Sequence, residues 1–285
     1  MKNDGQHEHK KNYRAGCSVA IITLNEDDNI KDCLDSVAGI ADEIVVLDSY
    51  STDQTETICR AYPGVQFSQH PFDGHVQQKN RALEKCRGDW ILCIDADERV
   101  SPELSQSIRQ FLQNPPAGIV GVKFPRLSFH MHRYIRHCGW YPNARYRLIK
   151  NGHAHWGGEN PHDKIILNGA GTALSGNLIH FPEKDLSDQV QTINQFSSIA
   201  ALMRYNKGRK YRLWRLLLKP FGTFLSMYIL KRGFLDGTQG LIIAVSSAYS
   251  TFLKEAKLFE LSVLGSDKPS NLPGRYQKTA TKSHR

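Results

Sequence analysis

The stretch that decides the fold is Gly88-Asp89-Trp90-Ile91-Leu92-Cys93-Ile94-Asp95-Ala96-Asp97-Glu98. Its middle is an apolar run of the length of a buried strand, which predicts a strand over 90–94. The run ends in two carboxylates, Asp95 and Asp97, which either cap the next turn or share a ligand. Because the two negative charges repel each other, a divalent cation is a natural partner. A cation held by one or two carboxylates, with its other positions open, suits the bridging of a diphosphate.

Strands and helices alternate around this stretch and predict an α/β fold. Strands are predicted at 19–24, 43–47, 65–69 and 90–94, and helices near 54–61, 75–86 and from Ser101-Pro102 onward. This alternation indicates right-handed βαβ units and a mainly parallel, Rossmann-like sheet with helices on both faces. Ligands of such sheets bind beyond the carboxyl ends of the strands. The context therefore favours a ligand site over simple turn capping for the two aspartates.

The charge of the chain predicts an anionic partner. The 285 residues include 37 Lys+Arg and 28 Asp+Glu, a formal net charge of +9. The segment 204–232 alone holds nine Lys/Arg and no Asp/Glu. Nucleic acid, phospholipid and a phosphorylated substrate all fit this composition. The absence of aromatic RNP, helix-turn-helix and KH signatures argues against nucleic acid.

Other features of the sequence exclude several classes of protein. The six cysteines include no C-x-x-C pair, which predicts buried free thiols in a reducing compartment and neither a disulfide scaffold nor a zinc knuckle. His130-x-His132 and His153-x-His155 lack the further ligands of a zinc site. The polar N-terminus predicts no signal peptide, and no stretch reaches the ~20 apolar residues of a membrane span.

Four segments, in order, resemble the family-2 inverting glycosyltransferases. They are Thr23-Leu24-Asn25-Glu26, Val46-Leu47-Asp48-Ser49-Tyr50-Ser51-Thr52-Asp53, Gln78-Lys79-Asn80-Arg81-Ala82-Leu83 and 88–98. Later segments look like the branch that builds the lipopolysaccharide inner core, commonly β-1,4-glucosyltransferases. These are Gly139-Trp140-Tyr141-Pro142, Arg145-Tyr146-Arg147-Leu148, Pro161-His162-Asp163 and Phe234-Leu235-Asp236-Gly237.

The resemblance implies a GT-A fold, a nucleotide-sugar donor and Mg²⁺ or Mn²⁺. By position, the nucleoside pocket would be lined by Thr23, Asn25, Glu26 and Asp48. Asp95 and Ala96 would face the ribose or diphosphate, and Asp97, together with Asp95, would ligate the metal. His180 would complete the metal site, or is a buried core histidine. Lys79 or Asn80 would approach the donor, or belongs to an exposed helix face.

Inversion at an anomeric carbon also needs a general base on the acceptor hydroxyl. The segment around Pro161-His162-Asp163 offers Asp163 as the first candidate and Glu159 as the second, unless these are turn residues of a Gly-rich loop. The resembling enzymes usually carry His-Glu where this chain has His162-Asp163. They also often carry Asp after Tyr-Pro, where this chain has Asn143.

The predicted organisation has five segments. A disordered N-terminal segment, 1–15, precedes a GT-A catalytic domain, 16–183, with a nucleotide-binding half, 16–118, and an acceptor-side half, 119–183. A basic helical extension, 184–265, and a disordered basic tail, 266–285, follow. In the extension, the cations and aromatic residues of 211–230 are typical of an interfacial helix on anionic lipid. The alternative is a helix that packs its apolar face on the catalytic domain.

Together these patterns predict an inverting, metal-dependent glycosyltransferase. It would move a hexose, glucose from UDP-glucose in the first place, onto a heptose of the lipopolysaccharide inner core or a similar glycolipid. Its expected location is cytoplasmic, peripheral on the inner face of the inner membrane. The alternatives are another surface glycan or a protein as acceptor, or a non-catalytic membrane- or carbohydrate-binding protein of this fold. The acidic, glycine-free segment after the first strand argues against a sugar-nucleotide pyrophosphorylase.

Overall fold

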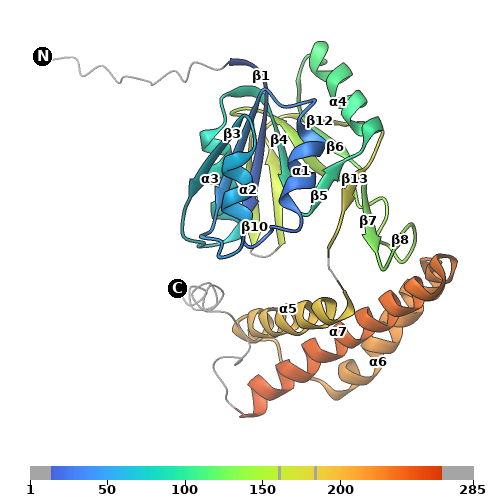
Figure 1. Cartoon of the computed structure of the whole chain (residues 1–285). Helices are drawn as coiled ribbons and strands as arrows, with labels where there is room; N and C mark the ends of the chain where they lie inside the picture. The colour runs from blue at the N-terminus through green and yellow to red at the C-terminus, as the bar shows by residue number, and fades with distance from the viewer. Residues whose placement is uncertain (1–13, 160–161, 183–184, 265–285) are drawn as a thin grey trace, which may run out of the picture.

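The computed structural model describes residues 14–159, 162–182 and 185–264. A seven-stranded sheet forms the middle of its α/β part (Figure 1). The strand order is β12-β6-β9-β4-β1-β2-β3. β1 is parallel to its neighbours β4 and β2, β2 is parallel to β3, and only the pairs that β9 forms with β4 and β6 are antiparallel among the described strands of this sheet. The mainly parallel sheet predicted from the sequence is confirmed.

The bounds of the strands are β1 Arg14–Thr23, β2 Glu43–Asp48, β3 Val65–Gln69, β4 Gly88–Asp95, β5 Glu98–Val100, β6 Ile119–Phe124, β7 Arg126–His130, β8 Arg133–Tyr134, β9 Arg145–Lys150, β10 Ala154–Glu159, β11 His162–Leu167, β12 Ala170–Ala173 and β13 Leu178–His180. The bounds of the helices are α1 Ile30–Val37, α2 Thr55–Ala61, α3 His75–Lys85, α4 Pro102–Gln113, α5 Leu186–Asn206, α6 Leu213–Leu225, the π-helix η1 Ser226–Leu230, the 3-10 helix η2 Gly233–Asp236 and α7 Gly237–Leu264.

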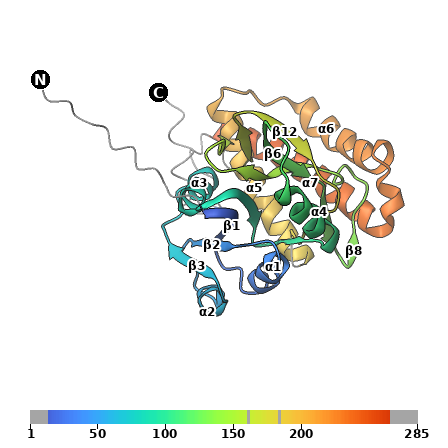
Figure 2. The same ribbon diagram turned by 90° about the horizontal axis from the view of Figure 1, so that it is seen from above.

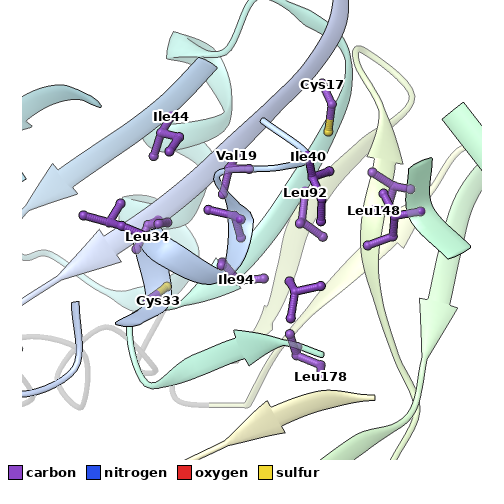
Figure 3. Close-up of a cluster of buried hydrophobic side chains, with 14 of the residues drawn as sticks. Cys17, Val19, Cys33, Leu34, Ile40, Ile44, Leu92, Ile94, Leu148 and Leu178 are labelled. Atoms are coloured by element: carbon purple, nitrogen blue, oxygen red, sulfur yellow. The ribbon is translucent and has the colours of Figure 1, made fainter. Parts of the chain in front are cut away.

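Alternate residues of the central strands pack on opposite faces of the sheet. On β4, Leu92 packs on one face and Cys93 on the other, because successive side chains of a strand point to opposite sides. The first face is covered by α1, α2 and α4, and Figure 3 shows Leu34 of α1 beside strand residues of this cluster. The second face is covered by α3 and the β10–β11 hairpin. Seen from above, α3 and α1 lie on opposite sides of the strands (Figure 2).

A second, four-stranded sheet of order β5-β13-β7-β8 continues from the end of β4. β13 is antiparallel to β5, and its last residue, His180, lies opposite Glu98. β13 is also parallel to β7, where His180 pairs with Ser128. This register brings the end of β13 next to the turn that holds Asp95 and Asp97.

The C-terminal helices α5, α6 and α7 lie together beyond one end of the α/β part (Figure 1). α7 packs along both α5 and α6. The buried Asp236 of η2 joins this region to the α/β part, because its carboxylate accepts hydrogen bonds from the backbone N–H groups of Arg136 and His137.

Several further predictions can be compared with the described residues. All six cysteines are free and buried, as predicted. None of the described helices has the length and apolarity needed to cross a bilayer. β1 already begins at Arg14, inside the segment predicted to be disordered. The rest of that segment and the predicted tail, 266–285, lie outside the described residues, and the domain boundaries stay a prediction.

Candidate active site

A cavity of about 550 Å³ lies at the carboxyl ends of β1 and β4, where the sheet topology predicts a ligand site. β13, β11, α3 and α5 also contribute to its wall. Eight of the residues predicted from the sequence line it: Thr23, Glu26, Lys79, Asp95, Ala96, Asp97, Asp163 and His180. Residues more than 150 positions apart in the chain therefore meet at one edge of the sheet.

The two aspartates are held by the tight turn that joins β4 to β5. Glu98, the first residue of β5, is fully buried, and its Oε2 accepts a hydrogen bond of 3.0 Å from the backbone N–H of Asp95. The other oxygen of Glu98 lies 2.8 Å from both Arg147 Nη2 and Arg126 Nε. Two guanidinium groups compensate the charge of this buried carboxylate, which holds the backbone of the turn in place.

Asp97 and His180 form the part of the site that suits a metal. His180 Nε2 lies 3.2 Å from Asp97 Oδ2, and His180 Nδ1 lies 3.2 Å from Ser128 Oγ. Within the described residues Asp97 Oδ1 is buried without a hydrogen-bond partner. A buried carboxylate oxygen without a donor is well suited to a hard cation.

The described residues contain no group of three or more His, Cys, Asp and Glu that would hold a metal by itself. A cation at Asp97 would therefore take its other ligands from a bound molecule and from water, as Mg²⁺ commonly does with phosphates. The residues present fit that kind of metal site. They do not form a closed protein cage.

Asp95 differs from Asp97, because both of its oxygens contact cations. Oδ1 lies 2.8 Å from Lys79 Nζ, and Oδ2 lies 2.8 Å from Arg147 Nη2. Burial alone would raise the pKa of Asp95, but the charges of Lys79 and Arg147 outweigh burial and hold its pKa well below the usual range. The predicted sharing of one metal by Asp95 and Asp97 stays a prediction, and in the structure two side-chain cations already compensate Asp95.

Lys79 links this cluster to the candidate base. Its Nζ lies 2.9 Å from Asp163 Oδ2 on β11 and 4.3 Å from the centre of the Trp156 ring. Burial would lower the pKa of Lys79, but Asp95 and Asp163 outweigh burial and raise it, so the lysine stays charged. Asp163 borders a second cavity of about 480 Å³ as well as the first, which places it between two binding spaces.

Asp48 and Asn25 build the loops beside the cavity. Asp48 is fully buried at the end of β2, and its Oδ1 accepts a hydrogen bond of 2.8 Å from Thr23 Oγ1. Its Oδ2 accepts from the backbone N–H of Ser51 at 2.8 Å. Asn25 has a left-handed backbone, φ +57°, and its Oδ1 accepts from the backbone N–H of Thr52 at 2.8 Å. Their predicted contact with a nucleoside stays a prediction.

The remaining predicted residues lie elsewhere. Asn80 donates to the backbone oxygen of Trp156 and accepts from its N–H, at 2.9 and 2.8 Å, and so joins α3 to β10. Its amide serves this junction between elements. The backbone of Glu159 pairs with His162 at the end of the β10–β11 hairpin, and its side chain lies outside the described part of the structure.

The sequence interpretation assigned no role to Arg126 and Arg147, although Arg147 contacts Asp95 and Arg126 contacts Glu98 in the same turn. A basic residue inside an apolar strand such as Arg147 needs a buried anion, which is a signal that the sequence does contain. It also missed Thr192 and Phe196 of α5, which line the first cavity. Nothing in the local pattern of α5 indicates that this helix reaches the sheet edge.

Comparison with known proteins gives one family match and several relatives. Residues 18–165 match the family described as Glycosyl transferase family 2. A lipopolysaccharide core biosynthesis glycosyltransferase, LpsC, from Rhizobium meliloti is 31% identical over 87% of this chain and 93% of its own length. An uncharacterized glycosyltransferase of Rickettsia typhi is 30% identical over 86% of this chain and 87% of its own length.

Solved structures give weaker likenesses. Glucosyl-3-phosphoglycerate synthase from Mycobacterium tuberculosis, solved with Mn²⁺ and UDP, is 28% identical with a TM-score of 0.32, over 40% of this chain and 44% of the synthase. TarS from S. aureus, solved with UDP-GlcNAc, is 15% identical with a TM-score of 0.48, over 88% of this chain and 92% of that chain. Both TM-scores are low, so the fold assignment rests on the strand order and on the family match.

Proposed function

The chain belongs to the family-2 glycosyltransferases, and on that premise we propose that it transfers a hexose from UDP-glucose with inversion and with the help of Mg²⁺ or Mn²⁺. Its GT-A-like α/β part provides the cavity, and the helical extension covers one side of it. The acceptor that we propose is a heptose of the lipopolysaccharide inner core or a similar glycolipid, by likeness to LpsC.

The observation that carries this proposal is the state of the Asp97 carboxylate. One of its oxygens is buried without a hydrogen-bond partner among the described residues, while Asp95, two residues away, is fully compensated. A site that bound only an anionic diphosphate, without a metal ion, would have a basic side chain next to this oxygen. A carboxylate with a free oxygen beside a histidine instead suits a divalent ion that a diphosphate completes.

Each group of residues in the site would have its own role in an inverting transfer. Asp97 and His180 would hold the divalent ion, which when bound offsets the negative charge on the leaving diphosphate. Thr23 and Glu26 would line the space for the nucleoside. Asp163 would accept the proton of the acceptor hydroxyl as the new glycosidic bond forms. Lys79 would hold the Asp163 carboxylate in place through its 2.9 Å contact.

A peripheral position on an anionic membrane is proposed for the extension, through residues 204–232. None of the residues of α6, all of which the structure describes, is buried. Leu213, Trp214, Leu217, Leu218 and Phe221 are each at least half exposed, and their spacing puts them along one side of the helix. Arg209, Lys210 and Arg212 precede them. This pairing of apolar and cationic residues suits the headgroup region at the inner face of the inner membrane, where a glycolipid acceptor would lie.

Nucleotide binding tests the proposal most directly. Isothermal titration of UDP should show clearly tighter binding with Mn²⁺ or Mg²⁺ than with a chelator, and Asp97→Asn should remove most of that difference. Exposed Asp32 gives a matched control, Asp32→Asn, which should bind as the wild type does. Mass spectrometry after incubation with several UDP-sugars and truncated lipopolysaccharides would then identify donor and acceptor. Metal-independent UDP binding and turnover would contradict the proposal.

A further inference from the structure

The second cavity, of about 480 Å³, adjoins the first through four shared wall residues, Lys79, Asp95, Arg126 and Asp163. Because the candidate base belongs to this shared wall, a molecule in the second cavity would present its hydroxyl to Asp163 from the side away from Thr23 and Glu26. The second cavity is therefore the space available to an acceptor.

The charges of the second cavity do not cancel. Three cations of the lining have carboxylate partners. Lys79 and Arg147 contact Asp95, and Arg126 contacts the buried Glu98, which does not itself line the cavity. Two further cations of the lining, Arg145 on β9 and Lys164 on β11, are exposed. Among the side chains that the structure describes, no carboxylate pairs with either of them. Within the described part of the chain, the lining therefore contains two exposed cations that no carboxylate neutralises.

A neutral side chain orients one of these cations. Arg145 Nε donates a hydrogen bond of 3.1 Å to Asn143 Oδ1. The amide holds the guanidinium in place without neutralising it, whereas an aspartate at position 143 would pair with it. An oriented and uncompensated guanidinium is a binding group for phosphate or carboxylate, because its paired N–H donors match two oxygens.

The rest of the lining suits a sugar ring. Tyr146 and Trp156 border the cavity together with Ala144 and Ile165. Aromatic rings with apolar neighbours suit the C–H faces of a sugar, and the two exposed cations would then contact its substituents. We propose that the second cavity binds an acceptor sugar that carries an anionic group, phosphate or carboxylate, through Arg145 and Lys164. This inference rests on the proposed function, since it names the acceptor class of the same site.

Binding of simple sugars by the full-length protein tests this assignment. The probes are glucose 6-phosphate, glucuronic acid and glucose, titrated in the presence of UDP and Mn²⁺. Both anionic sugars, or one of them, should bind at least tenfold more tightly than glucose, the difference expected of a charge-assisted hydrogen bond. The phosphate and carboxylate probes identify which anionic group the cavity prefers.

Variants locate the effect in the cavity. The double variant Arg145→Gln/Lys164→Gln should remove the tenfold preference. Asn143→Asp keeps the size of the side chain at position 143 but neutralises Arg145, so it should reduce the preference. Lys150→Gln removes an exposed cation from the opposite end of β9 and should change nothing. Equal binding of anionic and neutral sugars, failure of both anionic sugars to bind, or a preference that survives the double variant would overturn the assignment. UDP binding by the wild type tests the proposed function separately, so failure of the proposed function can be distinguished from failure of the acceptor assignment.

Discussion

At the scale of single residues, Lys79 connects two carboxylates from distant parts of the chain, Asp95 at the end of β4 and Asp163 on β11. Asp95 and Asp163 both line the two cavities, and only about 10% of the Lys79 side chain between them is exposed. Its position over the Trp156 ring adds a cation–π contact. Without this one ammonium group, Asp95 would lose one of its two cations and Asp163 the cation that holds it.

The effects of replacing Lys79 and of replacing Asp163 on the free energy of unfolding should therefore not be additive. Lys79→Met should lower the free energy of unfolding by about 3 kcal/mol, because it leaves buried negative charge uncompensated. In the double variant Lys79→Met/Asp163→Asn part of that loss should be recovered, with an interaction energy of about 1 to 3 kcal/mol. Urea unfolding of the four proteins of the cycle measures it. Strictly additive losses would show that the contact contributes nothing.

Asp163→Asn should separate chemistry from binding. The amide keeps the size of the side chain but cannot accept the proton of the acceptor hydroxyl, so turnover should fall by about a hundredfold or more. UDP affinity should change little, because the proposed nucleoside pocket is formed by other residues. Steady-state kinetics and calorimetry measure the two effects. Glu159→Gln is the comparison: a loss of turnover in that variant with an active Asp163→Asn would make Glu159 the base.

The ion pairs of Asp95 predict how stability depends on pH. The folded pKa of this carboxyl is depressed below the unfolded value of about 3.9. Its contribution to stability is therefore fully present above about pH 5 and is lost as the pH falls through the folded pKa. The difference in unfolding free energy between wild type and Asp95→Asn, about 3 kcal/mol, should be constant from pH 5 to 7 and shrink in more acidic solution. A difference that grows on acidification would contradict this.

Residue types after strand ends and the family resemblance together predicted eight residues of the cavity wall, and parallel strands bring those at strand ends to one edge. The sequence did not show which of these side chains have partners. Asp48 and Asn80 have the residue types of ligand-binding groups, yet their polar atoms bond to neighbouring loops and strands. Arg126 and Arg147 received no role because their partner, Glu98, comes from a distant part of the chain. The hydrogen-bond and ion-pair partners of a side chain depend on tertiary contacts, which the local sequence pattern does not show.

At the scale of elements, the strands and helices of the first half lie close to their predicted ranges, because apolar periodicity and turn signals agree there. Ser101 illustrates this agreement: its Oγ accepts from the N–H of Leu104, and Pro102 follows at the start of α4, as expected for an N-cap. For the second half, the sequence predicted an acceptor-side half, 119–183, without the ranges of its strands, and a helical extension, 184–265, where α5, α6 and α7 lie. The pairing of β13 with β5, which brings His180 to Asp97, joins segments about eighty residues apart, and no local signal specifies it.

The contact of η2 with the loop after β8 predicts a measurable link between the two parts of the molecule. Asp236 is buried, and its carboxylate accepts from two backbone N–H groups and lies 2.9 Å from His137 Nδ1. Asp236→Ala should lower the free energy of unfolding by about 2 to 3 kcal/mol, because it leaves buried donors without acceptors. Urea unfolding measures the loss. Asp236→Asn, which retains one acceptor oxygen, should lose less, and a larger loss in the Asn variant would contradict this account.

At the scale of the whole molecule, the cavity of the candidate active site and the exposed apolar side of α6 belong to neighbouring parts of the structure. α5 contributes Thr192 and Phe196 to the cavity, and α7 packs along both α5 and α6. A molecule that adsorbs through α6 would therefore hold its cavity close to the membrane surface. Such a position shortens the search for an acceptor that is itself anchored in lipid.

Flotation with vesicles measures this adsorption. The full-length protein should float with vesicles of phosphatidylglycerol and phosphatidylethanolamine at low salt, and less at high salt, because screening weakens the contribution of its cations. Leu217→Glu/Leu218→Glu places two charges on the side of α6 that would enter the lipid and should abolish flotation. Leu217 and Leu218 are about 62% and 63% exposed, so folding should be unaffected. Ile166→Glu, at an exposed apolar position on β11, is the matched control and should float as the wild type does. Equal flotation of wild type and the α6 double variant would show that another surface binds the lipid, and absence of flotation by the wild type would exclude membrane adsorption through its cationic extension.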